Sequence, residues 1–99
     1  MTGPFRWNAH NIEHIAEHGV TAEEAESVIC DARSPFPRMI GNDKSLVWGQ
    51  TENGDYLQVI FIYSPPGTIY VIHARPMTDK EKSRLRQRRR YPCESVLKK

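Results

Sequence analysis

The sequence predicts an α+β domain: two N-terminal helices, then a four-stranded antiparallel meander sheet, then a basic C-terminal helix. Apolar residues recur at helical spacing in the first third of the chain, whereas the following segments are strand-like and separated by glycine and proline turn signals. A chain of 99 residues has room for one domain with one core. We expect this single domain to span residues 1–90 and a flexible tail to follow at 91–99.

Two helices are predicted at the start of the chain. The first covers about 9–18, where apolar residues have the i, i+3, i+4 spacing of a buried stripe, and Gly19 is suited to end it. Thr21 and Glu24 then have the spacing of a capping box. They predict a second helix that ends near Asp31.

The strand pattern begins after Pro35 and Pro37, which are typical of a sheet edge because proline donates no hydrogen bond. Asn53-Gly54 predicts a type I′ hairpin turn. The segment that follows this turn is apolar on both faces for much of its length, so we expect it to lie centrally in the sheet. The four expected strands are 38–41, 44–51, 56–63 and 68–75.

Charge is divided unevenly along the chain. Residues 1–77 carry five Lys/Arg and nine Asp/Glu, whereas 78–99 carry nine and three. Thr78 and Glu81 form a second capping box, and the helix they open is expected to reach about residue 90. Leu85 is its only large apolar residue, so little packing on its own domain is predicted. Its basic face is either simply solvated or a nucleic-acid footprint, with Lys80, Lys82, Arg84, Arg86, Arg88 and Arg89 as the RNA-binding candidates.

The cysteine pattern and the apolar runs bear on the compartment. Cys30 and Cys93 belong to no CxxC or Cys/His pattern, which favours free thiols in a reducing compartment. The N-terminus lacks the apolar run of a signal peptide, and 59–63, the longest apolar run, is too short to span a bilayer. We therefore expect a cytoplasmic protein without membrane association.

Arg75 is the first catalytic candidate. It ends a strand whose predicted alternation places it on one face with Ile69, Val71 and His73. A guanidinium that follows apolar residues on a sheet face needs an anion. That anion is either a substrate phosphate or, as the alternative, a carboxylate of the first helix such as Glu13 or Glu17.

The histidines are candidates for acid–base chemistry, because imidazole titrates near neutrality. His14 and His18 are spaced i, i+4 and are therefore neighbours on a helix. Such a pair can bind zinc, but no HExxH or similar arrangement surrounds it, and we predict no metal site and no cofactor. The other interpretation is that these side chains bond backbone groups near the end of the helix.

Three stretches of the chain resemble the BrnT family of toxins. The first runs from Phe5-Arg6-Trp7-Asn8 through Asn11-Ile12-Glu13-His14-Ile15-Ala16-Glu17-His18-Gly19-Val20-Thr21 to Glu23-Glu24-Ala25-Glu26. The second is Leu46-Val47-Trp48-Gly49-Gln50-Thr51, followed by Gly54-Asp55-Tyr56-Leu57. The third is Ile72-His73-Ala74-Arg75-Pro76-Met77-Thr78-Asp79-Lys80-Glu81, which is similar to the family's Ile-Thr-Ala-Arg-x-Met-Thr signature. The resemblance as a whole extends over about 5–90.

The resemblance implies a RelE-like fold and a type II toxin–antitoxin toxin. Its activity would be metal-independent RNA cleavage by the 2′-hydroxyl. A ribbon-helix-helix antitoxin of the BrnA type would neutralise it, in a heterotetramer or alongside a toxin homodimer. By position, the resemblance implies His18, Lys44 and Arg75 as site residues. His73 stands where Ser or Thr is usual and is the fourth catalytic candidate.

Two departures from the family pattern weaken the expected binding of a phosphate. Lys44 replaces a frequent Arg and lacks its bidentate fork, and Gln50 stands where many relatives have Arg. The competing hypothesis is therefore a binding module without catalysis, which docks an antitoxin and adds nucleic-acid affinity to a DNA-binding complex.

Overall fold

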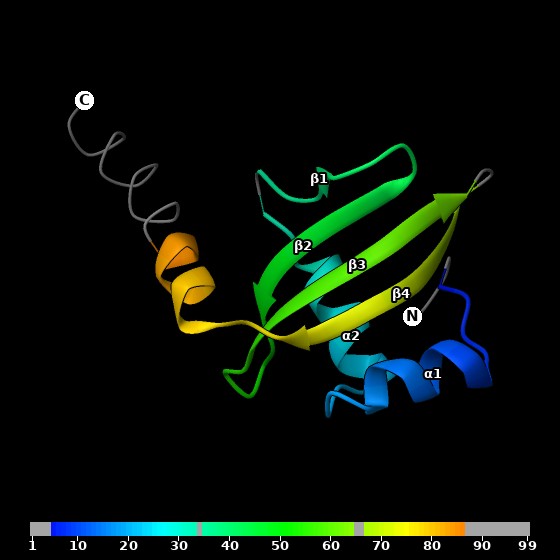
Figure 1. The fold of residues 1–99 in the computed structure, drawn as a ribbon, viewed down its shortest axis with the longest axis horizontal. Coiled ribbons are helices and arrows are strands. Elements are labelled where there is room, and N and C mark those ends of the chain that lie inside the picture. Colours follow the sequence, from blue (N-terminus) through cyan, green and yellow to red (C-terminus); the bar gives the residue numbers. More distant parts are fainter. Residues whose placement is uncertain (1–4, 34, 65–66, 87–99) are drawn as a thin grey trace.

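The computed structural model describes residues 5–33, 35–64 and 67–86. It is an α+β fold whose antiparallel sheet has the strand order β1-β2-β3-β4 (Figure 1). The predicted fold class and the four-stranded antiparallel sheet are thus confirmed. The elements are α1 (Ala9–Ala16), α2 (Ala22–Cys30), β1 (Arg38–Met39), β2 (Lys44–Gln50), β3 (Tyr56–Ser64), β4 (Thr68–Pro76) and a third helical segment at 79–86.

The first two helices cover one side of the sheet (Figure 1). α1 packs along β4, the last strand of the sheet, while α2 packs against β2 and β3. Ile15, Val28, Val47 and Val59 lie between the layers with at most 1% of each side chain exposed. The core therefore fixes α1 beside β4, where three of the four catalytic candidates reside.

A buried asparagine ties α1 to β4. Asn8 and Asn11 form a capping box at the start of α1. The Asn11 amide, only 1% exposed, donates through Nδ2 to the carbonyls of Arg6 and Val71, both at 3.2 Å. Because a buried amide left unpaired is costly, these bonds fix the position of α1 along the strand.

The turn between the helices follows the predicted chemistry. Regular α1 geometry stops at Ala16, two residues earlier than predicted. Gly19 then takes a φ of +77°, and the Val20 amide donates to Ile15. The capping box of Thr21 and Glu24 is confirmed.

Strand β4 contains a bulge that the predicted alternation missed. Its pairing with β3 shifts register at Ile72. As a result Val71 and Ala74, three positions apart, are both in the core at 1% and 0% exposed. The predicted single face through Val71, His73 and Arg75 is therefore wrong. Because of the extra residue, His73 and Arg75 alternate with Ala74 and lie away from the core face.

The hairpin between β2 and β3 uses a different turn from the one predicted. Among the described residues only glycines have a positive φ, so Asn53 does not, and the type I′ prediction is wrong. Gly54, with φ +95°, donates to the Thr51 carbonyl, while the Thr51 amide donates to Asp55. One left-handed glycine after a tight turn is the arrangement of a longer, bulged hairpin loop.

The segment at 79–86 is attached more firmly than its composition predicted. The Thr78–Glu81 capping box is confirmed, with bonds of 2.9 and 3.2 Å. Leu85 is only 3% exposed and belongs to the core cluster. The expectation of little packing is therefore wrong, because the one large apolar residue of this segment is buried in the core.

Some predictions fall outside the described residues. The predicted end of the last helix near residue 90 and the tail at 91–99 lie there. Among the helices that the structure describes, no helix has the length and apolar character needed to cross a membrane.

Candidate functional site

Three imidazoles gather where α1 meets β4. The ring centroids of His18 and His73 are 5.5 Å apart, those of His14 and His73 6.1 Å, and those of His14 and His18 6.5 Å. The i, i+4 spacing on the first helix positions His14 beside His18, and His73 on β4 lies close to both rings. We call these three residues the histidine cluster. The sequence reasoning considered His14 for acid–base chemistry but selected only His18 and His73 as catalytic candidates.

The electrostatics of the histidine cluster favour a neutral His73. Burial lowers the pKa of His73 below its usual value of 6.5, and the positive charges of His18, Arg75 and His14 lower it further. Near neutral pH the His73 ring is therefore unprotonated and able to accept a proton. Arg75 lies two residues from His73 on the same strand, so the two side chains point to the same face of β4.

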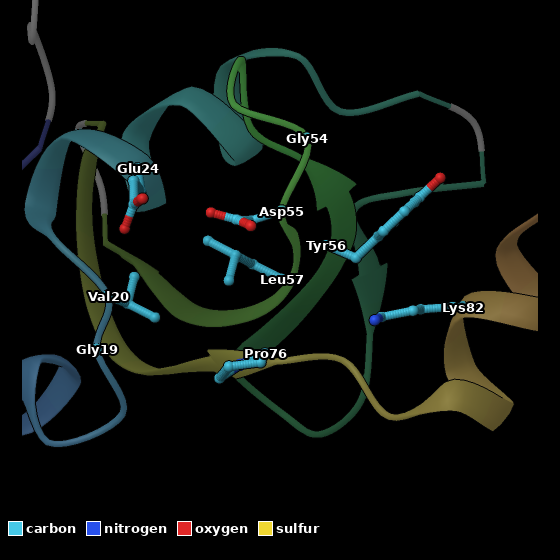
Figure 2. Close-up of a pocket in the computed structure, with 9 residues that line it drawn as sticks. All are labelled: Gly19, Val20, Glu24, Gly54, Asp55, Tyr56, Leu57, Pro76 and Lys82. Atoms are coloured by element: carbon cyan, nitrogen blue, oxygen red, sulfur yellow. The ribbon is translucent and has the colours of Figure 1, made fainter.

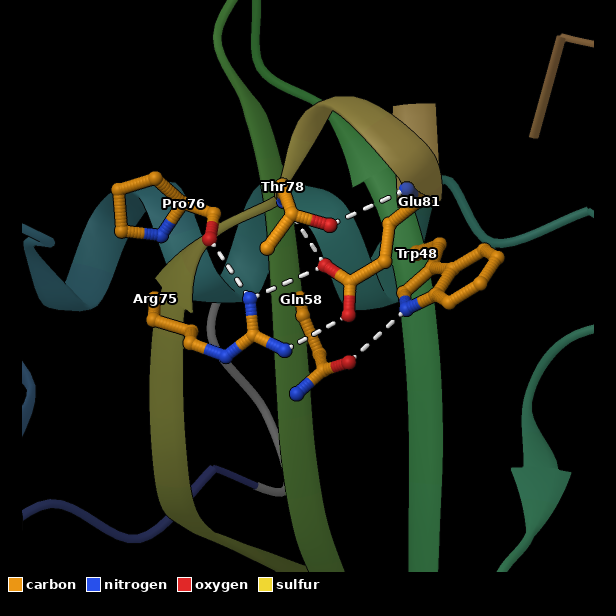
Figure 3. Close-up of polar contacts among 6 residues, drawn as sticks. All are labelled: Trp48, Gln58, Arg75, Pro76, Thr78 and Glu81. Atoms are coloured by element: carbon orange, nitrogen blue, oxygen red, sulfur yellow. Dashed lines mark hydrogen bonds and ion pairs between the residues drawn. The ribbon is translucent and has the colours of Figure 1, made fainter. Parts of the chain in front are cut away.

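Arg75 is held by a carboxylate, but by a different one from those considered in the sequence. Its Nη1 and Nη2 donate to Glu81 Oε1 and Oε2 at 3.0 and 2.8 Å, and Nη1 also donates to the Pro76 carbonyl at 2.9 Å (Figure 3). The alternative of an ion pair is thus confirmed, whereas its suggested partners Glu13 and Glu17 are wrong. The Arg75 side chain remains 27% exposed.

The ion pair shifts the pKa values of both groups in the direction that favours their charged forms. The hydrogen bonds with Arg75 are the main reason that the pKa of the Glu81 carboxyl is lowered, and they also raise the pKa of the Arg75 guanidinium. Glu81 has a second task, since its Oε1 accepts from the Thr78 amide. Arg75 therefore connects the end of β4 to the first turn of the helical segment 79–86.

A polar row crosses the sheet beside Arg75. Trp48 on β2 pairs with Gln58 on β3, and Gln58 pairs with Arg75 on β4. The indole Nε1 of Trp48 donates to Gln58 Oε1 at 3.0 Å (Figure 3). The sequence did not single out Gln58, because an isolated glutamine on a strand carries no pattern. Trp48, Gln58 and Arg75 form what we call the cross-strand row.

Lys44 does not join this site. It lies opposite Ile62 on β3, whereas Arg75 lies opposite Gln58. Four residues of β3 separate the two positions, which corresponds to about 13 Å along the strand. The expectation that Lys44 and Arg75 belong to one site is therefore wrong, since the register places Lys44 at the other end of the sheet.

The basic helical segment lies beside Tyr56, the first residue of β3. The Lys82 ammonium and the Arg86 guanidinium lie 5.9 and 5.7 Å from the centre of the Tyr56 ring. Lys80 and Arg84 are exposed. Arg88 and Arg89, the remaining RNA-binding candidates, lie outside the described residues.

A hollow of about 310 Å³ lies near this helical segment but apart from the histidine cluster. Figure 2 shows Glu24 and Asp55 extending toward it, with Lys82 on another side. Of the predicted site residues, only Lys82 lines it. The histidine cluster and Arg75 therefore do not line this hollow.

Among the residues that the structure describes, no group of three or more His, Cys, Asp and Glu side chains is arranged to hold a metal ion.

Comparisons of the chain with protein-family models, curated proteins and solved structures find no match. The resemblance to the BrnT toxins thus stays a prediction. The site must be interpreted from its own geometry: a histidine cluster beside a partly exposed arginine, next to a polar row across the open sheet.

Proposed function

We propose that this chain is a metal-independent endoribonuclease with a RelE-like fold, the toxin of a BrnT-type toxin–antitoxin pair. The observation that carries the proposal is that His73 lies beside two further imidazoles and two residues from Arg75 on the same strand. Acid–base groups and one cation are what RNA cleavage without a metal requires. The nucleophile, a 2′-hydroxyl, comes from the RNA itself.

The proposed reaction uses two imidazoles. His73, whose lowered pKa keeps it neutral, takes the proton from the 2′-hydroxyl. The 2′-oxygen then bonds to phosphorus and the bond to the 5′-oxygen breaks. His18, the imidazole nearest to His73, gives a proton to that leaving oxygen. The products are a 2′,3′-cyclic phosphate and a free 5′-hydroxyl. Acid–base help of this kind accelerates reactions by about 10²–10⁴-fold.

Arg75 supplies the charge stabilisation in this mechanism. Negative charge accumulates on the phosphate as the 2′-oxygen attacks, and a positioned guanidinium stabilises it. Both terminal nitrogens of Arg75 are bound to Glu81 in the free chain. A phosphate must therefore displace or share the position of this carboxylate, and Glu81 acts as its internal competitor.

The exposed location suits a polymer substrate. The basic residues at 80–86 continue from the end of β4 and extend the positive charge beyond Arg75. Such charges bind the RNA backbone without reading its sequence. Arg88 and Arg89 belong to the same proposed RNA-binding set.

The proposal includes a partner and a compartment. A ribbon-helix-helix antitoxin would neutralise the chain in the cytoplasm, either in a heterotetramer or on a toxin homodimer, and the complex would repress its own operon. These properties follow from the BrnT resemblance.

One observation favours the second candidate, a binding module without catalysis. A bidentate carboxylate on Arg75 is what a purely structural arginine would show. In that case the chain would bind RNA or an antitoxin through its basic segment and leave RNA intact.

A cleavage assay separates the two candidates. The purified chain is incubated with single-stranded RNA in the presence of EDTA, and the new ends are analysed. We expect cleavage that EDTA does not stop, with 2′,3′-cyclic phosphate ends, and loss of both cleavage and growth arrest in Arg75→Ala and His73→Ala. Arg33→Ala, an exposed arginine outside the site, is the control. Intact RNA with the wild-type chain would reject the nuclease and leave the binding module.

A further inference from the structure

The cross-strand row holds one side chain whose hydrogen-bonding direction is fixed. An indole N–H is a donor and cannot accept. The Gln58 atom that receives the Trp48 bond at 3.0 Å must therefore be the carbonyl oxygen Oε1. The amide nitrogen Nε2 is then turned away from Trp48, as Figure 3 shows.

Trp48 is itself held in place. Its ring lies 5.7 Å from that of Phe36, which is 7% exposed. The amide of Gln58 is therefore oriented by a packed neighbour and not by solvent. Among the described residues, the hydrogen bond from Trp48 is the one that the Gln58 side chain forms, and Nε2 takes no part in it. Gln58 is half-buried and presents two N–H donors.

These donors lie next to the proposed phosphate position. Gln58 and Arg75 are paired residues of adjacent strands, whose backbones are about 4.8 Å apart. A nucleotide whose phosphate contacts Arg75 can place its base over Gln58. Proteins read RNA sequence mostly from single strands, where base edges are free to bond.

We infer that Gln58 selects the base beside the cleaved phosphate, with guanine preferred over adenine. This inference rests on the proposed function. Guanine offers two neighbouring acceptors, O6 and N7, which match a group that only donates. Adenine offers N7 beside an N–H donor, and its usual pairing with glutamine needs the amide oxygen that Trp48 already occupies. The substrate class is therefore single-stranded RNA with guanine next to the scissile bond.

The test compares oligoribonucleotides that differ only in the bases flanking one cleavable phosphate. We expect wild type to cleave the guanine substrate roughly tenfold faster than the adenine substrate. Gln58→Leu keeps the size of the side chain but removes its donors, and should bring the ratio close to one. Trp48→Phe keeps an aromatic ring against Phe36 and releases the Gln58 amide. The cleavage rate of the adenine substrate should therefore increase more than that of the others. Thermal unfolding checks that each variant is folded.

Binding of non-cleavable 2′-O-methyl versions of these oligonucleotides separates the inference from the proposed function. A guanine preference in binding without any cleavage by wild type would reject the nuclease and support the role of Gln58. An unchanged guanine-to-adenine ratio in Gln58→Leu would overturn the inference while leaving the nuclease intact. Equal binding and equal cleavage of all bases by wild type would overturn it as well.

Discussion

Strands β2 and β4 each carry one cation that the sequence proposed as a phosphate ligand, and they place it in opposite surroundings. Arg75 lies near the end of β4, two residues from His73, and contacts Glu81. Lys44 starts β2 in an exposed position next to a turn. The difference shows that residue type is not enough, because the strand register decides which cation meets acid–base groups.

The largest expected effect is on the cleavage rate, and it tests this comparison by removing each cation in turn. Arg75→Ala should slow RNA cleavage about 10²–10³-fold, the usual cost of losing a group that stabilises developing charge. Lys44→Ala should change the rate by less than about twofold, since a distant exposed charge contributes mainly through screened attraction. Single-turnover cleavage rates measure both. Equal losses in the two variants would mean that Lys44 reaches the phosphate after all.

The next largest effect is expected on stability, when the attachment of the helical segment 79–86 is weakened. Leu85→Ala should lower the free energy of unfolding by about 2–4 kcal/mol, because it empties a buried position. Arg84→Ala, on the exposed face of the same segment, should change it by less than about 0.5 kcal/mol. Urea unfolding compares the two variants. A small effect of Leu85→Ala would show that the segment is not part of the cooperative unit.

The ion pair at the end of β4 contributes less to the free energy of unfolding. Glu81→Gln keeps a side chain that can complete the capping box but removes the charge that faces Arg75. We expect a loss of about 0.5–1 kcal/mol at neutral pH and low salt, as for other partly exposed pairs.

The pH dependence of this loss has a definite sign. The pKa of Glu81 is lowered in the folded chain from its ordinary value of 4.5. Its stabilising effect is therefore fully present above that value and is lost as the pH falls through the lowered pKa. Urea unfolding at neutral and at strongly acidic pH should show the difference between wild type and variant disappearing in acid. A difference that persists in acid would assign the effect to the cap and not to the charge.

Helix capping was the part of the fold that the sequence predicted well. Thr21 with Glu24, and Thr78 with Glu81, form their capping boxes because each needs only a few neighbouring residues. The bulge at Ile72 could not be predicted, because the alternation of β4 looks regular until its pairing with β3 is known. The histidine cluster joins His14 and His18 to His73 of a distant strand, so no pattern within one segment could reveal it.

The candidate site shows the same division. Arg75 stood out through its position at the end of a strand, whereas its partner Glu81 was already explained as a capping residue, and nothing indicated a second role. Gln58 gained meaning only when the register placed it between Trp48 and Arg75. Pairings across strands depend on the whole chain, which is why a pattern within one segment does not reveal them.

The smallest expected effect is on the pH dependence of cleavage, and it tests how the neighbours of His73 in the histidine cluster change its pKa. His14→Gln removes one of the positive neighbours that lower the pKa of His73. The pKa of His73 should therefore rise. A general base must be unprotonated to act, so the acidic limb of the cleavage rate against pH should move to higher pH. Burial is the main cause of the lowered pKa and stays in place, which keeps this displacement small.

The matched control for this displacement is His10→Gln. His10 lies one helical turn before His14 on α1 and is exposed, and it is not among the groups that shift the pKa of His73. Its replacement makes the same side-chain change on the same helix without touching the histidine cluster. A limb that moves equally in both variants would reflect net charge alone. A limb that moves only in His14→Gln would identify His73 as the proton acceptor, because no other described group has a lowered pKa caused by His14.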